Sequence, residues 1–325
     1  MISINHVMSN AVESGIFTDI INYYSMYAPK SVQHVQSMQP LGGSILRHYH
    51  RPNLEKQLMG PSVVTVHHDL TDDDTSLQVE TFLDRYREAD RVICLNTLQQ
   101  QYLAKVNIHH TTVIPHGYND RFIAPRGESR GANFAHGTGS GVDGRIVIGM
   151  LSRRYPRKVK GESYVYELAQ RLDPRYFEFV LIGRGRAYDA AVLEKYGYQV
   201  SAYESIPYRT VASTYQHIDA LLMASWHEGG PANIPEAVAA GVPVLCNPIG
   251  MAYDLITDEL NGLHLSMNAS ADSDRIAAWL LDAAQMKALR RGAAECVQRA
   301  ISWRVHVART FDVYREVIHS TLGEL

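Results

Sequence analysis

The sequence predicts an α/β protein made of two domains, and three observations support this fold class. The chain has 325 residues, a length that favours two domains of ordinary size. Short apolar segments alternate with helix-like segments, which is typical of parallel sheets covered by helices. A stretch rich in Gly, Ser and Asn, residues 127–144, separates the two halves and is predicted to be a flexible linker.

Composition and charge narrow the function classes. Hydrophobic residues make up 46% and charged residues 20% of the chain, which indicates a globular protein with apolar side chains for two cores. The net charge of −3 argues against a dedicated nucleic-acid-binding protein. Cys94, Cys246 and Cys296 are widely spaced, so we expect buried free thiols in a reducing cytoplasm. The strand-like start at Ile2 does not resemble a signal peptide, and no apolar run approaches the ~20 residues that span a bilayer.

The strands of each half are predicted from apolar alternation and from their flanking turns. Helical spacing of apolar residues begins at Ile16 and ends before Pro29, and another helix begins at Thr97. Late in the chain, residues 272–301 form one long helical pattern, followed by a last helix after Trp303. In the first half the predicted strands are 2–8, 31–38, 61–66, 91–95 and 111–115. In the second half they are 146–151, 177–182, 199–203, 220–224, 242–246 and 263–265. Nucleotides bind at the carboxyl ends of such parallel strands.

The rest of the chain is organised around one motif, residues 226–244. Two carboxylates, Glu228 and Glu236, lie eight positions apart, the first in a loop and the second about one and a half turns inside a predicted alanine-rich helix. Both are expected to point toward one ligand above the start of that helix, where free backbone N–H groups favour a phosphate. Gly229 and Gly230 allow the backbone to approach that ligand closely.

This motif resembles the Glu-x7-Glu signature of glycosyltransferase family 4, and the following residues, EAVAAGVPVL, resemble the family's EA-x-A-x-G-x-PV run. The family's members are retaining, nucleotide-sugar-dependent enzymes with the GT-B fold. The resemblance therefore implies two Rossmann-like domains with parallel sheets that face each other across a cleft. The implied boundaries are 1–124 for the acceptor-side domain, 125–144 for the linker and 145–303 for the donor-binding domain. A C-terminal crossover helix, about 304–325, is expected to return to the first domain.

The resemblance also assigns roles within the motif. It gives Glu228 the hydroxyls of the donor sugar and Glu236 those of the ribose. Gly229 and Gly230 would bring N–H groups to the sugar or the phosphates. The same donor site is expected to include Pro231, Ala232 and Asn233.

A basic loop follows the first strand of the second half, and five of its ten residues, 152–161, are Arg or Lys. A solvated charge run and a nucleic-acid patch are alternatives, but the loop's place at the end of a strand favours the donor site. The loop resembles the family's GRL-x-x-x-KG segment, which implies that Arg154 and Lys160 neutralise the leaving diphosphate. Arg153 and Lys158 form an alternative register.

Three further positions carry weaker signals. His67 ends the strand of TVHHDL, which resembles the family's TVHD strand end, where a histidine reaches the donor sugar or the reacting centre; His68 is the alternative. Gly15 is the single glycine of the first strand–turn–helix, where a plain turn glycine is as plausible as a phosphate contact. Ile206 lies in the segment where the family holds the base.

The acidic run 72–74 admits two interpretations. An Asp-x-Asp pair holds a divalent metal on the nucleotide sugar in the other large glycosyltransferase fold, GT-A. We favour an acidic helix start, because Leu77 and Phe82 follow at helical spacing and carboxylates stabilise a first helical turn. No metal and no cofactor is therefore expected besides the nucleotide-diphosphate sugar as co-substrate.

Together these features predict a retaining glycosyltransferase that acts on a glycan or lipid-linked acceptor, by analogy in cell-envelope polysaccharide or lipopolysaccharide synthesis. The expected location is cytoplasmic, at the inner face of the cell membrane if weak peripheral contact occurs. The alternatives are a GT-B-fold epimerase or phosphorylase and a non-catalytic nucleotide-binding subunit of a glycan synthase. The donor base, the acceptor and the oligomeric state are left open by the sequence.

Overall fold

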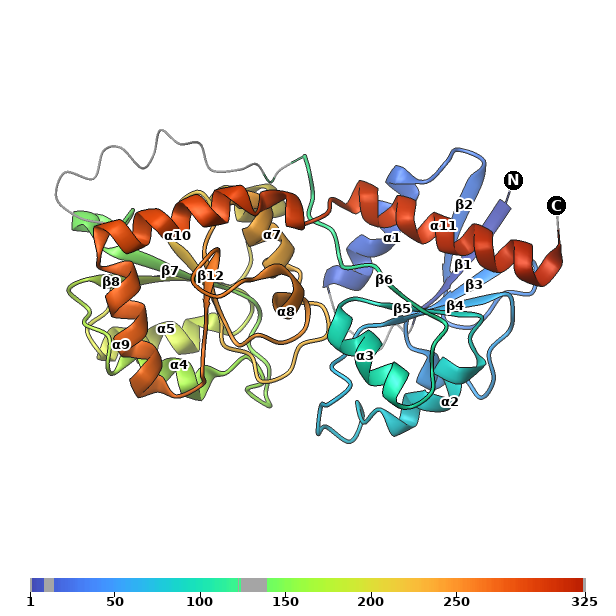
Figure 1. Cartoon of the computed structure of the whole chain (residues 1–325), viewed down its shortest axis with the longest axis horizontal. Coiled ribbons are helices and arrows are strands. Elements are labelled where there is room, and N and C mark those ends of the chain that lie inside the picture. Colours follow the sequence, from blue (N-terminus) through green and yellow to red (C-terminus); the bar gives the residue numbers. More distant parts are fainter. Residues whose placement is uncertain (1, 9–14, 122, 124–138, 324–325) are drawn as a thin grey trace. The chain divides into compact units, whose positions relative to one another are not determined.

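A computed structural model describes residues 2–8, 15–121, 123 and 139–323 (Figure 1). The chain divides into two compact units. The first unit comprises residues 1–117, 228–232 and 301–325, and the second comprises 118–227 and 233–300. The predicted linker residues 125–138 lie outside the described residues. Ser140, which follows them, is anchored to the second unit, since its backbone N–H and its hydroxyl both donate to Asp219.

The first unit contains a six-stranded sheet in which every strand pair is parallel, in the order β2-β1-β3-β4-β5-β6. This is the flavodoxin-like strand order extended by one strand. The C-terminal helix α11 packs against α1 and contacts β4 (Figure 1). The strands are β1 (Ile2–Val7), β2 (Val32–Ser37), β3 (Leu46–Tyr49), β4 (Ser62–Val66), β5 (Arg91–Cys94) and β6 (Thr111–Val113). The helices are α1 (Gly15–Tyr27), the short 3-10 helix η1 (Pro52–Leu54), α2 (Glu80–Glu88), α3 (Thr97–Lys105) and α11 (Trp303–Leu322).

The second unit contains a parallel sheet with the order β12-β11-β10-β7-β8-β9, the dinucleotide-binding strand order. Its core is aliphatic and aromatic, with Ile146, Leu181 and Leu222 among the buried side chains. The strands are β7 (Ile146–Leu151), β8 (Phe177–Ile182), β9 (Val200–Tyr203), β10 (Ala220–Met223), β11 (Val244–Cys246) and β12 (Gly262–His264). The helices are η3 (Val142–Gly144), α4 (Glu162–Ala169), α5 (Arg186–Lys195), α6 (Tyr208–Thr214), α7 (Asn233–Ala240), α8 (Met251–Leu255), α9 (Ala269–Leu280), α10 (Ala283–Glu295) and η4 (Val297–Arg299).

One strand was not predicted from the sequence, and three sequence predictions need correction. Strand β3 was not predicted, because all four of its residues are buried and show no apolar–polar alternation. The long helix predicted over 272–301 is two helices, and Asp282 accepts a hydrogen bond from Gln285 N–H as the N-cap of the second. Asp72–Asp74 do not start a helix: they lie in turns closed by their own carboxylates, and α2 begins only at Glu80. Helix α7 begins at Asn233, so Glu236 lies in its first turn.

Other predictions hold. Cys94, Cys246 and Cys296 are buried free thiols, and burial raises the pKa of the Cys94 thiol to about 12. Trp303 is a packing residue, since it is buried and stacks on Tyr23 with ring centroids 4.6 Å apart. Within the described ranges, no helix combines the length and the apolar composition that crossing a bilayer requires.

Candidate active site

The second sheet has a topological switch point between β7 and β10, which are neighbours in the sheet although two strands, β8 and β9, lie between them in the sequence. In open α/β sheets, ligands bind beside the carboxyl ends of the strands at such a point. The loop after β7 is the basic segment 152–161. The loop after β10 leads into the motif that contains Glu228. The sheet therefore brings together, within the second unit, the basic loop and the start of that motif.

Two contacts hold these loops against each other. The Trp226 N–H donates to the Val159 carbonyl over 2.9 Å. Gly161 adopts a φ of +76°, and a Cβ at this position would lie 1.9 Å from the Ala224 carbonyl oxygen. Only glycine fits there, which gives the Lys160–Gly161 pair a physical reason.

Arg153 and Lys160 converge on one aromatic ring. The guanidinium of Arg153 lies 4.5 Å and the ammonium of Lys160 5.6 Å from the centroid of Tyr155. Lys158 is exposed and has a φ of +53° in the turn between them. The residues that the structure brings together are thus Arg153 and Lys160, one from each of the two predicted registers.

The Arg154 side chain contacts a different group of residues, on helix α5. Its Nε donates to Asp189 over 3.1 Å, and its guanidinium lies 4.6 Å from the Tyr188 ring centroid. Asp189 also binds Arg186, a fully buried arginine that reaches Glu162. The predicted pairing of Arg154 with Lys160 on one ligand is therefore not what the structure shows, because Asp189 holds the Arg154 side chain against α5.

Arg186 was missed by the sequence analysis. Its Nε donates to the Ser152 carbonyl over 2.7 Å and a terminal nitrogen donates to the Ser152 hydroxyl over 3.0 Å. It therefore fixes the first residue of the basic loop. The available signal was an arginine directly after the Gly-x-Gly turn of residues 183–185.

Glu236 is held from α6 and its flank. Tyr208 donates to Oε1, and Tyr215 donates to Oε2 over 2.8 Å. Burial and the neighbouring Glu236 carboxylate raise the pKa of Tyr215 well above its usual value, so this hydroxyl stays a donor. Asn233 donates to the Leu151 carbonyl over 3.1 Å. Its buried Oδ1 has no hydrogen-bond partner in the described part of the chain, which suits a site that receives a polar ligand.

The middle of the motif, residues 228–232, belongs to the first unit. The Gly229 carbonyl accepts from Asn96 Nδ2 over 2.7 Å, and the Gly230 carbonyl accepts from His116 Nδ1 over 3.1 Å. A Cβ on Gly229 would lie 2.5 Å from the His67 carbonyl oxygen, and one on Gly230 would lie 2.4 Å from Leu95. Gly229 is therefore required for packing in the first unit, because its neighbours are backbone atoms, whereas a side chain at position 230 would have to displace the end of the Leu95 side chain.

The flanks of these glycines are less enclosed. Glu228 and Ala232 are half-buried, whereas Pro231 is buried. The structure thus places Glu228 in the first unit and Glu236 in the second.

The two candidate histidines point in different directions. The His68 ring lies 4.1 Å from that of Phe82, and burial lowers its pKa to about 4. His68 is therefore part of the core beneath α2. His67 Nε2 instead lies 2.9 Å from His50 Nδ1, on the opposite face of the sheet, so His67 is the better candidate of the two.

The weaker sequence signals are placed as follows. Gly15 is the first residue of α1, and the turn before it, residues 9–14, lies outside the described residues. Ile206 is half-buried in the loop between β9 and α6. In the same loop region, the Glu204 carboxylate accepts hydrogen bonds from the N–H groups of Gly185 and Ala187 at the start of α5. That helix N-terminus is thus occupied by the chain's own carboxylate.

Comparisons with known proteins bear on the residues described above. No curated protein matches the sequence. Residues 140–295, slightly less than half of the chain, match the family model described as "Glycosyl transferases group 1". This part of the chain is thus similar to the domain that the family model describes. It contains the basic loop and Glu236.

Solved structures resemble nearly the whole chain. Sucrose-phosphate synthase from Thermosynechococcus elongatus matches with a TM-score of 0.78 and 16% identity, over 99% of this chain and 100% of that one. A glycosyltransferase from Rickettsia africae gives 0.70 and 14%, over 98% and 99%. Alr3699/HepE from Anabaena, in complex with UDP and glucose, gives 0.70 and 15%, over 97% and 100%. The fold is thus the predicted two-domain α/β GT-B fold, and the predicted enzyme class, a glycosyltransferase, is confirmed by the matched domain.

Proposed function

We propose that the protein is a retaining glycosyltransferase of the family 4 type, which moves a sugar from a nucleotide-diphosphate sugar to a glycan or lipid-linked acceptor. One observation carries the proposal. At the switch point of the second sheet, two cationic side chains, Arg153 and Lys160, flank one tyrosine in a loop fixed to the end of β10. Such a pair offers positive charge where a leaving diphosphate becomes more negative.

The remaining residues take the following roles in this proposal. Glu236 binds the ribose hydroxyls, since a carboxylate that accepts from two tyrosines still has lone pairs for further donors. Glu228 binds hydroxyls of the donor sugar, and His67 acts on that sugar or at the reacting centre. The acceptor attacks the face from which the phosphate leaves, and the leaving phosphate takes up the acceptor's proton. This route needs no metal ion.

For the donor, the acceptor and the cellular location, the proposal names classes only. Alr3699/HepE is described in complex with UDP and also with UDP-glucose, which makes uridine diphosphate sugars the first donors to test. The acceptor is proposed to be a cell-envelope polysaccharide or lipopolysaccharide precursor, used at the cytoplasmic face of the membrane. This setting rests on the resemblance to family 4.

The first experiment measures the thermal shift of the full-length protein with nucleoside diphosphates and their sugars. A true donor stabilises the fold by mass action, by roughly 2.7 kcal/mol at a hundred times its dissociation constant. Transfer is then followed as nucleoside diphosphate release with and without candidate acceptors. Release of sugar only to free phosphate would instead favour a phosphorylase, and binding without turnover would favour a non-catalytic subunit.

Variants of the basic loop test the role of its charges. We expect Arg153→Ala and Lys160→Ala to lower kcat by about 10²-fold each, because each removes one charge that stabilises the transition state. Arg157→Ala removes an exposed charge from the same loop and serves as the matched control. Glu228→Ala should lower turnover strongly while the fold persists. Wild-type transfer rates in Lys160→Ala or Glu228→Ala would refute the role assigned to that residue.

A further inference from the structure

One face of the first sheet carries histidines where an apolar layer is expected. Alternate residues of a strand share a face, so His6 lies on the same face as Ile4 of β1, which packs in the core beneath α1 and α11. His48 is the register partner of His6 on β3. His34 lies on β2, and His50 and His67 directly follow β3 and β4. These rings form a polar row inside the first unit, at the sheet's own switch point between β1 and β3.

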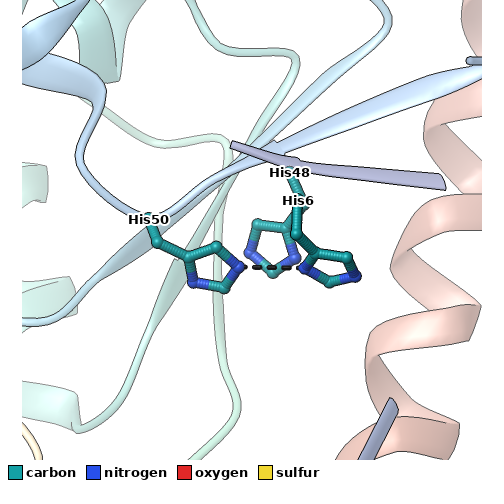
Figure 2. Close-up of side chains that lie close together, drawn as sticks. All are labelled: His6, His48 and His50. Carbon is teal, nitrogen blue, oxygen red and sulfur yellow. Dashed lines mark hydrogen bonds between the residues drawn. The ribbon is translucent and has the colours of Figure 1, made fainter. Parts of the chain in front are cut away.

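Hydrogen bonds join four of these rings end to end. His34 Nδ1 lies 2.8 Å from His6 Nε2. His6 Nδ1 lies 3.0 Å from His50 Nε2, the contact drawn as a dashed line in Figure 2. His50 Nδ1 lies 2.9 Å from His67 Nε2. The two middle rings are buried, with 0% and 2% exposure, whereas the two end residues are half-buried.

Each ring in the row is neutral at physiological pH. Burial lowers the pKa of His34 to about 4 and that of His50 to about 3, and it lowers those of His6 and His67 well below 6.5. A neutral imidazole has one N–H donor and one lone pair. Both nitrogens of His6 and both of His50 are used within the chain, so each of these rings must donate on one side and accept on the other.

This requirement leaves two complete arrangements. Either every ring carries its proton on Nδ1, or every ring carries it on Nε2. The two arrangements can be distinguished at His34, the first ring of the hydrogen-bonded row. Its buried Nε2 has no hydrogen-bond partner among the described residues. A buried N–H without a partner is rarer than a buried acceptor without one. The edge-to-face contact of His34 with Phe311, 5.6 Å between centroids, offers at most a weak N–H···π substitute.

We propose that His34, His6 and His50 form a directed hydrogen-bond chain that fixes His67 as the Nδ1–H tautomer. Each ring donates from Nδ1 to Nε2 of the next, beginning at His34. His67 then accepts at Nε2 and holds its proton on Nδ1. His34, His6 and His50 are positioning residues: they set which nitrogen of His67 carries the proton.

A metal site is the main alternative use of the same cluster. Ring nitrogens of His6, His48 and His50 lie within 4.8 Å of one another, and Figure 2 shows the three rings together. Both nitrogens of His48 are engaged, however, by the Tyr314 hydroxyl and by Thr65 Oγ1, each over 2.6 Å. A metal would have to displace one of these bonds and the His6–His50 bond, so the geometry favours the hydrogen-bond chain.

The consequence for transfer rests on the proposed function. If His67 acts on the donor sugar or the reacting centre, the fixed tautomer makes its Nδ1 a hydrogen-bond donor, suited to a sugar or phosphate oxygen. It does not leave a lone pair there for a general base. The hydrogen-bond chain thus gives His67 an orienting role, and the acceptor's proton is taken up by the leaving phosphate.

The test is ¹⁵N NMR of the histidine-labelled full-length protein at pH 8, without substrate. Nδ1–H and Nε2–H tautomers have distinct ¹⁵N shifts and long-range couplings to the ring protons. We expect Nδ1–H for all four rings. The decisive variant is His34→Asp, whose carboxylate accepts only and sits where Nδ1 was. It should force His6 to donate from Nε2 and so convert His67 to Nε2–H, three hydrogen bonds away. His34→Asn, which has the same shape and can donate, should keep His67 as Nδ1–H.

Several results would overturn the proposal. These are Nε2–H or mixed tautomers at His67 in the wild type, an unchanged His67 in a folded His34→Asp protein, or stoichiometric zinc uptake that shifts the His6 and His50 signals. Activity is the second readout. We expect His34→Asp to lower kcat about tenfold relative to His34→Asn, because a wrong tautomer loses a hydrogen bond in the transition state. Absence of transfer in the wild type would refute the proposed function while leaving the NMR test of the chain intact.

Discussion

The two units are built on six-stranded parallel sheets, yet their interiors differ in kind. The core of the second unit is aliphatic and aromatic, and within its described residues no histidine is buried. The first unit encloses five histidines with 2% exposure or less: His6, His48, His50, His116 and His306. Hydroxyls of the covering helices complete this polar layer, as when Tyr314 on α11 contacts His48.

The difference shows two ways to stabilise the same architecture. Aliphatic packing gains free energy from buried area and is insensitive to pH. A buried imidazole layer is stable only while its rings are neutral and hydrogen-bonded. The second unit instead buries ion pairs, most extensively around Arg186, where Asp189 and Glu162 compensate its charge.

The largest expected effect is selective acid unfolding of the first unit. Unfolded histidines take up protons near their ordinary pKa of 6.5, whereas burial lowers the folded pKa of His50 and His116 to about 3. The unfolded state therefore binds more protons below pH 6.5, so stability is present above that pH and is lost as the pH falls toward 3. Below pH 6.5, each buried ring lowers the free energy of unfolding by about 1.4 kcal/mol per pH unit. Five such rings lower it by roughly 7 kcal/mol per pH unit, which approaches the whole stability of a domain.

The tryptophans allow this prediction to be measured for each unit. Trp303 lies in the first unit, whereas Trp226 and Trp279 lie in the second. Urea unfolding of a Trp226→Phe/Trp279→Phe protein reports on the first unit, and unfolding of Trp303→Phe reports on the second. Between pH 7.5 and 5.5 the midpoint should fall much further for the first probe. Equal losses for both probes would show that the histidine layer does not set the acid response.

The next effect concerns the buried charge of the second unit. Arg186→Met should destabilise that unit by about 3–5 kcal/mol, because it leaves the Asp189 and Glu162 carboxylates without their buried cation. The control is Arg175→Met, which removes an exposed arginine that pairs with Asp173 and should change the stability little, because solvent screens a surface ion pair. The urea midpoint at pH 7.5, read from Trp279, measures both. A loss in Arg186→Met no larger than in the control would contradict the role of this network.

The sequence was most informative where local pattern and structure coincide. Eleven strands follow from apolar runs between turn residues, since burial of both sheet faces gives such runs. Strand β3 could not be predicted in this way, because it contains Arg47 and His48. Both are buried with their polar groups hydrogen-bonded to Gly60 and Thr65, and no local sequence pattern indicates such partners. In the sequence, the buried histidine layer is indicated only by the spacing of two between His48 and His50 and by histidines at the ends of strands.

The candidate site could be predicted in identity but not in geometry. The motif indicated Glu236 and the two glycines, yet only the fold shows that Tyr208 and Tyr215 hold that carboxylate. Likewise, the positive charge of the basic loop was evident from the sequence, but the choice of the arginine that pairs with Lys160 was not. Arg154 is drawn to Asp189, a residue 35 positions away, and such a partner is visible only after folding.

The smallest expected effect compares one helix cap in each unit. Asn96 caps α3 by accepting from Gln99 N–H, and it also donates to the buried Gly229 carbonyl. Asn268 caps α9 by accepting from Ser270 and Ala271 N–H, and among the described residues its side chain makes no hydrogen bond outside that helix turn. Asn268→Ala should therefore cost about 1 kcal/mol, and Asn96→Ala about 2 kcal/mol, because the latter also leaves a buried carbonyl without its donor.

Asn96→Asp separates the two contributions. It keeps the oxygen that caps α3 but replaces the amide donor with a second oxygen facing the Gly229 carbonyl. If the bond to Gly229 matters, Asn96→Asp should lower the urea midpoint of the first unit at least as much as Asn96→Ala does. If it is as stable as the wild type, the cap alone explains Asn96, and the segment 228–232 is held in the first unit by glycine packing and by His116.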